Sequence, residues 1–122
     1  MTEKPEIDFP DSPPPADLQI RDVVEGDGAE ATPGSTVLAH YVGVSHSTGE
    51  EFDASYNRGQ PLEFRLGVGQ VIPGWDQGIA GMRVGGRRQL VIPPHLAYGD
   101  RDMGSIAPGE TLIFVVDLVD VT

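Results

Sequence analysis

The residues of this chain that could do covalent chemistry are few, and their spacing excludes most kinds of enzyme. The chain has no cysteine, which excludes thiolate nucleophiles, disulfides and cysteine-bound metals. Its three histidines, His40, His46 and His95, lack the His-x-x-x-His spacing of a zinc site. Neither a Gly-x-Ser-x-Gly motif nor a phosphate-binding glycine motif occurs, so a serine hydrolase and a phosphate cradle are not indicated. The sequence therefore predicts no metal and no cofactor.

A set of aromatic and aliphatic side chains on separate segments remains, with a single carboxylate among them. The members are Tyr41, Phe52, Leu62, Val71, Ile72, Trp75, Tyr98 and Phe114, and the carboxylate is Asp53. Taken alone, these are ordinary packing residues, because strands and helices must bury an apolar face. An apolar binding pocket is the alternative, and composition does not distinguish the two.

Length and charge restrict the partners of the protein. At 122 residues the chain has the size of one domain with one hydrophobic core. Eight Lys and Arg against 19 Asp and Glu give a net charge of −11, which would repel a phosphate backbone, so nucleic acid is not an expected partner. No apolar run approaches the roughly 18 residues of a membrane span. We expect a soluble monomer without a membrane partner, and we interpret the basic cluster Arg83, Arg87 and Arg88 as the solvated edge of a strand.

The N-terminal segment differs in composition from the rest of the chain. Residues 1–16 hold five prolines and four acidic residues against one lysine. Such a stretch cannot bury enough apolar area to offset the entropy lost on ordering, so a flexible, acidic, proline-rich tail is predicted. We expect one domain over residues 17–122. The segment has neither the basic start nor the apolar stretch of an export signal, so a cytoplasmic location is expected.

Strand patterns dominate the predicted domain. Alternating or β-branched runs bounded by turn residues predict strands at 18–23, 36–44, 51–53, 62–66, 87–92 and 111–121. In the last of these, both alternating registers are largely apolar, which is typical of a strand packed on both faces. We therefore expect residues 111–121 to lie in the centre of the sheet.

One helix is indicated, over residues 74–82. Its shared face, at positions i, i+4 and i+7, consists of Trp75, Ile79 and Met82. Gly78 and Gly81 each lower intrinsic helicity by roughly 1 kcal/mol relative to alanine, so the helix needs tertiary packing to persist. Their missing side chains also permit a close approach to a sheet, which favours an antiparallel sheet curled around the helix.

Seven motifs follow one another between residues 40 and 114. They are His-Tyr-Val-Gly (40–43), Gly-Glu-Glu-Phe-Asp-Ala-Ser (49–55), Pro-Leu-Glu-Phe-Arg-Leu-Gly (61–67), Val-Ile-Pro-Gly-Trp-Asp-Gln-Gly (71–78), Met-Arg-Val-Gly-Gly (82–86), Ile-Pro-Pro-His-Leu-Ala-Tyr-Gly (92–99) and Ile-Ala-Pro-Gly-Glu-Thr-Leu-Ile-Phe (106–114). In this order they resemble the FKBP family of immunophilins, the prolyl isomerases that bind tacrolimus and rapamycin.

The resemblance implies both a fold and an activity. The fold is α+β, a five- or six-stranded antiparallel sheet wrapped around one short helix. The activity is peptidyl-prolyl cis-trans isomerisation that assists protein folding, with proline-containing polypeptides as substrates and tacrolimus- or rapamycin-type macrolides as ligands. Isomerisation breaks no covalent bond, so desolvation and stabilisation of the twisted amide in an aromatic pocket would suffice.

The resemblance also assigns roles to the aromatic set. Trp75 would be the floor on which a proline ring rests, the Ile72 N–H and the Tyr98 hydroxyl would bind substrate carbonyls, and Asp53 would be held by a hydrogen bond near Tyr41. The implied catalytic residues are Tyr41, Asp53, Trp75, Tyr98 and Phe114, and the implied ligand-binding residues are Phe52, Leu62, Val71, Ile72, Met103 and Ile106.

Two departures from the family pattern concern this pocket. Leu62 stands where the family often has phenylalanine, and the loop from Gly99 to Ile106, with Met103 as its expected pocket residue, is about one residue shorter than the commonest form. These departures support the alternative to an enzyme, a non-catalytic module that binds proline-containing segments or acts as a chaperone.

Overall fold

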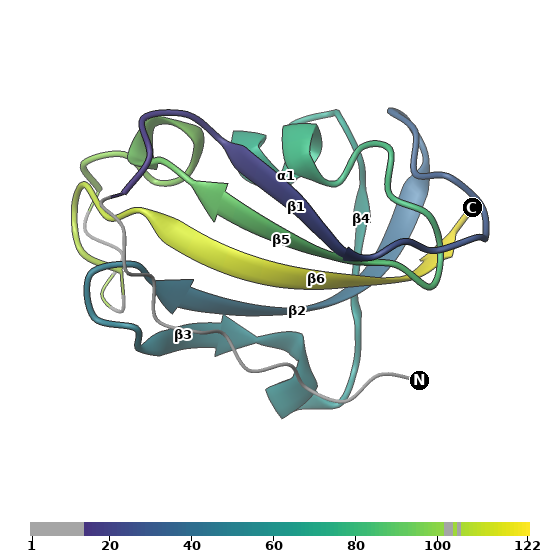
Figure 1. Ribbon diagram of the computed structural model, residues 1–122, viewed down its shortest axis with the longest axis horizontal. Helices are drawn as coiled ribbons and strands as arrows, with labels where there is room; N and C mark the ends of the chain where they lie inside the picture. The colour runs from purple at the N-terminus through teal and green to yellow at the C-terminus, as the bar shows by residue number, and fades with distance from the viewer. Residues whose placement is uncertain (1–13, 102–103, 105) are drawn as a thin grey trace.

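In the part of the chain that the structure describes, six antiparallel strands form one sheet around a single short α-helix. The computed structural model describes residues 14–101, 104 and 106–122 (Figure 1). Its strands are β1 (Gln19–Val24), β2 (Thr36–Ser45), β3 (Glu51–Ala54), β4 (Leu62–Arg65), β5 (Arg87–Ile92) and β6 (Leu112–Val121), and its helices are α1 (Pro73–Gly78) and the 3₁₀ turns η1 (Ser55–Arg58) and η2 (Pro94–Leu96). All six predicted strands are confirmed, and no observed bound differs from the predicted one by more than one residue. The predicted tail lies almost wholly outside the described residues.

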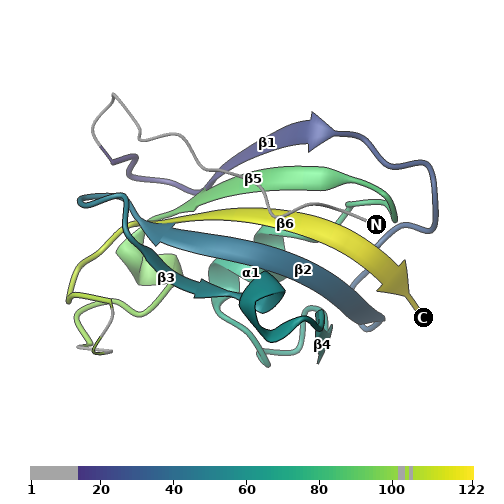
Figure 2. The ribbon, with the colours of Figure 1, turned by 90° about the horizontal axis from the view of Figure 1, so that it is seen from below.

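Strand β6 is the centre of the sheet, as its apolar pattern predicts. The strand order is β1-β5-β6-β2-β3, and β4 pairs with the first half of β2. Residues 112–118 of β6 are buried, because β5 and β2 flank the strand and both of its faces are covered. In Figures 1 and 2 the strands curve around α1, which lies against one face. The main core lies between that face and the helix.

The helix is shorter than its sequence pattern predicts. It ends at Gly78 instead of residue 82, and Ile79 caps it with a hydrogen bond from its N–H to the Trp75 carbonyl. Gly81 adopts a φ of 90°, which right-handed helix cannot contain, and its N–H donates to the Ala31 carbonyl instead. Trp75, Ile79 and Met82 are nevertheless all buried in the same core. No helix in the described ranges has the length and apolar character needed to cross a membrane.

Two glycines allow α1 to lie directly on β5. A Cβ atom added to Gly74 would stand 2.5 Å from Ile92 Cγ2, and one added to Gly78 would stand 2.7 Å from Leu90 Cδ2. Both distances are far below van der Waals contact, so any larger residue would push the helix off the strand. The close approach expected for Gly78 and Gly81 is confirmed for Gly78 and wrong for Gly81, where an added Cβ would meet nothing within 4 Å.

In the cluster of Arg83, Arg87 and Arg88, the last two side chains form hydrogen bonds with other segments of the fold. The interpretation of the cluster as a solvated strand edge is therefore wrong for these two residues. Arg87 Nε donates to Asp117 Oδ1 at 2.6 Å, and Asp117 is buried within β6. Arg88 bonds to Asp22 of β1 and to the carbonyls of Gly78 and Ala80 at the end of α1. Because their acceptors come from distant segments, the local charge pattern does not reveal them.

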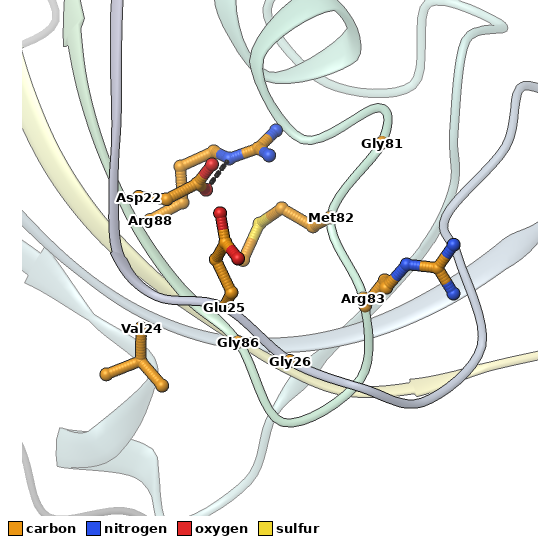
Figure 3. Close-up of a pocket in the computed structure, with 9 residues that line it drawn as sticks. All are labelled: Asp22, Val24, Glu25, Gly26, Gly81, Met82, Arg83, Gly86 and Arg88. Atoms are coloured by element: carbon orange, nitrogen blue, oxygen red, sulfur yellow. Dashed lines mark hydrogen bonds and ion pairs between the residues drawn. The ribbon is translucent and has the colours of Figure 1, made fainter.

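We predict that Gly26→Ala destabilises the fold by about 1–3 kcal/mol, the usual range for overpacking. The chain that leaves β1 at Gly26 crosses the turn before β5 (Figure 3), and an added Cβ would stand 2.5 Å from the Arg83 carbonyl oxygen and 2.6 Å from the Gly86 nitrogen. These are backbone atoms, so neither can rotate away. Urea unfolding measures the change, and the neighbouring exposed variant Asp27→Ala, which should lie within about 0.5 kcal/mol of the parent, is the control. Equal stability of the two variants would contradict the prediction.

Candidate active site

An open cavity of about 500 Å³ lies beside the start of α1. Its lining comes from four strands, α1 and two loops, and consists of Tyr41, Phe52, Asp53, Leu62, Gly69, Gln70, Val71, Ile72, Trp75, Ala97, Tyr98, Arg101 and Phe114. Aromatic and aliphatic side chains predominate among these residues. Segments far apart in the sequence therefore converge on one apolar hollow, as the pocket interpretation of the aromatic set requires.

Trp75 contacts three other rings of this aromatic cluster. Its ring centroid is 4.9 Å from that of Tyr41 and 5.2 Å from that of Phe114, both in edge-to-face geometry. Phe64 packs against it at 5.6 Å and does not line the cavity. Only 4% of the Trp75 surface is exposed, and its Nε1 is buried without a hydrogen-bond partner among the described residues. Packing therefore holds the indole in one orientation.

A glycine on β2 makes room for the two phenylalanines of the cavity. Gly43 pairs with Phe114 of β6, and a Cβ at Gly43 would lie 2.6 Å from Phe52 Cζ and 2.7 Å from Phe114 Cε1. With no side chain there, the two rings meet edge to face at 5.5 Å. The glycine of the His-Tyr-Val-Gly motif is thus required by the packing of the wall.

One carboxylate in the cavity is neutralised by a local network. Tyr41 Oη donates to Asp53 Oδ2 at 2.5 Å, Arg58 Nη1 donates to Asp53 Oδ1 at 2.8 Å, and Arg58 Nη2 donates to Tyr41 Oη at 2.8 Å. The three residues come from β2, β3 and η1, and the register of β2 with β3 brings the first two together. The network fixes the Tyr41 ring and cancels the charge of Asp53 at the edge of the apolar surface.

The pKa values of these groups follow from burial and from the network. Partial burial acts to raise the pKa of Asp53, but the hydrogen bonds from Tyr41 and Arg58 and the charge of Arg58 outweigh it, so the net pKa is lowered. Burial and the bond to Asp53 raise the pKa of Tyr41. Burial, with the nearby Asp53 charge, also raises the pKa of Tyr98. At neutral pH the carboxylate is therefore ionised and both phenols keep their protons.

The loop that forms one rim is tied to the helix. Asp76 of α1 accepts hydrogen bonds from the Gly67 N–H at 2.8 Å and from the Gly69 N–H at 3.1 Å, one on each carboxylate oxygen. Gly69 and the next residues, through Ile72, line the cavity. The helix that carries the indole therefore also positions this part of the rim.

The sequence matches one family over most of its length. The model of the FKBP-type peptidyl-prolyl cis-trans isomerases matches residues 28–119. The chain belongs to this family. The family resemblance stated for the sequence is thus confirmed, together with the isomerase activity that it implies.

Relatives of this FKBP-type chain include both bacterial and eukaryotic proteins. An FK506-binding protein of Streptomyces anulatus is 70% identical over 121 residues, which cover 98% of each chain. The peptidyl-prolyl cis-trans isomerase FPR2 of Saccharomyces cerevisiae is 51% identical over 111 residues, covering 87% of this chain and 82% of FPR2. The crystal structure of AtFKBP13 superposes with a TM-score of 0.80 at 47% identity, covering 86% of this chain and 93% of that one. The expected FKBP-like fold is thus confirmed.

Most of the residues assigned to the pocket by the family resemblance line the cavity of this FKBP domain. They are Tyr41, Phe52, Asp53, Leu62, Val71, Ile72, Trp75, Tyr98 and Phe114. Ile106 is buried in the core beside them and is not part of the lining. Met103 falls outside the described residues. Leu62 is half-buried in the wall, where the family often has phenylalanine.

The residue that sequence reasoning missed is Arg58. It lies five positions after Asp53 and, at the end of η1, reaches back to that carboxylate and to Tyr41. The position of Arg58 shortly after Asp53, the one carboxylate of the aromatic and aliphatic set, was the sequence feature that could have indicated this pairing. Gln70, Ala97 and Arg101 also line the cavity without having been singled out.

We predict that Arg58→Gln raises the pKa of Asp53 and lowers stability more at pH 7 than at pH 2. Because the folded pKa lies below the unfolded value of about 3.9, Asp53 contributes stability above that value and loses it as pH falls through the folded pKa. Asp53 is 42% exposed, so solvent screening keeps this contribution below about 1 kcal/mol. Carbon-13 NMR of the Asp53 carboxyl gives its pKa, and urea unfolding at both pH values gives stability.

The control for this prediction is Arg65→Gln, which removes an exposed arginine bonded to the Gly34 carbonyl away from the cavity. It removes the same charge and should leave the pKa of Asp53 nearly unchanged. An unchanged Asp53 pKa in the Arg58 variant would show that Tyr41 alone holds the carboxylate.

Proposed function

We propose that the chain isomerises X-Pro bonds by a non-covalent route in which the proline ring enters the apolar cavity and rests on Trp75. The walls are Tyr41, Phe52, Leu62, Val71, Ile72, Tyr98 and Phe114. The observation that carries this proposal is that the cavity wall offers hydrogen-bond donors without a partner among the described residues, and these suit a substrate whose polar groups near proline are carbonyl oxygens.

Two of these donors are the groups assigned by the family resemblance. Within the described residues, the Ile72 N–H donates to no backbone carbonyl, and the Tyr98 hydroxyl makes no hydrogen bond. Both residues line the cavity. The raised pKa of Tyr98 keeps its hydroxyl protonated, so it can donate across the neutral range. In this proposal the two groups bind carbonyl oxygens on either side of the rotating bond.

The physical task is to lower a rotation barrier. Amide resonance gives X-Pro rotation a barrier of about 18–20 kcal/mol, and uncatalysed exchange takes tens to hundreds of seconds. Water stabilises the charge-separated planar amide, so an apolar cavity that removes this water favours the less polar, twisted state. An acceleration of about 10⁵ requires about 7 kcal/mol, which desolvation and a few oriented donors can supply.

Asp53 takes no proton in this mechanism. Its lowered pKa and its bonds to Tyr41 and Arg58 make it a poor base, and the reaction transfers no proton. We propose that it orients Tyr41 and acts electrostatically on the twisted bond. Because the network leaves little net charge, the cavity retains its apolar character.

The wider setting of the activity is also part of the proposal. We propose that residues 17–122 act as one monomeric domain, in the cytoplasm, on proline-containing segments of folding polypeptides. Relatives named as FK506-binding proteins, one of them matching over 98% of this chain, support tacrolimus-type macrolides as ligands of the same cavity.

We predict that the protein accelerates cis-trans exchange in a proline peptide and that Asp53→Ala lowers kcat/KM at least several-fold without loss of fold. The reason is that Tyr41 loses its acceptor and the cavity loses its oriented carboxylate. A protease-coupled assay on a series of peptides differing before proline measures kcat/KM, and circular dichroism monitors the fold. Binding of these peptides without acceleration would favour the non-catalytic module, for which Leu62 is the supporting departure.

We also predict that Trp75→Ala weakens tacrolimus binding more than tenfold. Removal of the indole takes away the floor and, as loss of a large buried side chain, costs about 3–5 kcal/mol of stability. Phe64→Ala is the matched control, because Phe64 is equally buried against Trp75 but does not line the cavity. Calorimetric titration well below the melting temperature of both variants should show affinity loss only for Trp75→Ala. Equal loss in both would assign the effect to stability alone.

A further inference from the structure

A second hollow of about 570 Å³ adjoins the proposed proline site. It is lined by His95, Ala97, Tyr98, Gly99, Asp100 and Arg101, on η2 and the turn that follows it. Ala97, Tyr98 and Arg101 line both hollows, so the two are continuous across these residues. A polypeptide with its proline ring on Trp75 therefore has a path past Tyr98 for the residues next to proline.

Arg101 is the available cation on this path. Among the cavity-lining residues in the described ranges, only Asp53 and Arg101 carry a formal charge, and Asp53 is neutralised by Arg58. The Arg101 N–H donates to the Tyr98 carbonyl at 3.1 Å, which fixes its backbone beside the site. Its side chain is exposed, and none of the ion pairs or side-chain hydrogen bonds between described residues involves it.

Among the described residues, Arg101 differs from the arginines that bind carboxylates of the fold. Arg58, Arg87 and Arg88 each form short hydrogen bonds to a carboxylate of the chain. Arg101 instead lies where two hollows meet, near Tyr98, whose hydroxyl has no hydrogen-bond partner among the described residues. A guanidinium offers a planar pair of donors that matches the two oxygens of a carboxylate.

We infer that Arg101 is a specificity-determining residue that favours an Asp or Glu side chain within two residues of the isomerised proline. This inference rests on the proposed isomerase function and adds a substrate class to it. Because the ion pair forms at an exposed rim, its effect is modest, about two- to fivefold in kcat/KM, and decreases with salt.

The remaining charged groups along the path do not replace this role. Asp100 lines the second hollow, and its Oδ1 would stand 3.9 Å from a Cβ atom added to Gly109. His95 is exposed on η2 and lines the second hollow only. Neither residue lines the proline cavity, whereas Arg101 lines both hollows.

The test measures preference as a ratio, so that a general loss of activity does not affect it. Peptides carry one proline and either Glu or Gln at the second or first position before it, or at the first or second position after it. NMR exchange spectroscopy gives kcat/KM for each without a coupling protease, for the parent protein and for Arg101→Gln. The control is Arg21→Gln, an exposed arginine on β1 outside both hollows that removes the same charge.

The expected result is a two- to fivefold preference for Glu over Gln at one or more positions in the parent. The preference should shrink in 0.5 M salt, vanish in Arg101→Gln and persist in Arg21→Gln, and Arg101→Glu should favour Lys over Gln at the same position. An equal Glu-to-Gln ratio in the parent and in Arg101→Gln at all four positions overturns the inference. If the Gln peptides are not accelerated by the parent at all, the proposed function itself fails, so the two failures are distinguishable.

Discussion

The close contact between α1 and β5 is the constraint on which the rest of this structure depends. Gly74 and Gly78 bring the helix backbone against Ile92 and Leu90, and the first turn of the helix carries Trp75. A helix held farther away would lower the indole out of reach of the β2 and β6 rings. Its two glycines weaken the helix in isolation, so the contact that positions the cavity floor is also what keeps the helix folded. Stability and site geometry are thus linked through one interface.

A second consequence concerns the carboxylate near the cavity. An uncompensated charge would keep water in the hollow and oppose the desolvation on which the proposed mechanism relies. Arg58 and Tyr41 solve this by satisfying both oxygens of Asp53. The same bonds hold the Tyr41 ring edge-on to Trp75. The network is therefore compatible with an apolar site, because Tyr41, Asp53 and Arg58 satisfy one another's hydrogen bonds.

Much of this fold could be predicted from the sequence, because local patterns determine local structure. The double-sided apolar run of β6 indicated a central strand, and turn residues separated the others correctly. The helix was predicted four residues too long, because Ile79 and Met82 continue a helical spacing after Gly81 has changed the backbone direction. Arg87 was placed on a solvated edge, because its buried partner Asp117 lies 30 residues away on a strand whose register no local pattern specifies.

The residues of the site could be predicted only in part from the sequence. Composition left the aromatic set as either core or pocket, and the ordered family motifs decided between them. The hydrogen bonds of Arg58 were not predicted, because they require the pairing of β2 with β3 that brings Tyr41 and Asp53 together. The proposed role of Arg101 could not be predicted from the sequence, because it depends on where two hollows meet on the folded surface.

The difference between the proposed floor of the cavity and its rim indicates which residues select among substrates. Trp75 and Phe114 belong to elements packed on several sides, and in the proposed mechanism they meet a proline ring, which every X-Pro substrate shares. Rotation transfers no proton and breaks no bond, so these residues cannot distinguish one substrate from another by reactivity. Discrimination therefore depends on contacts with the neighbouring residues of the substrate. Those contacts are made at the rim, where Asp76 braces the loop on one side and the exposed Arg101 carries charge on the other.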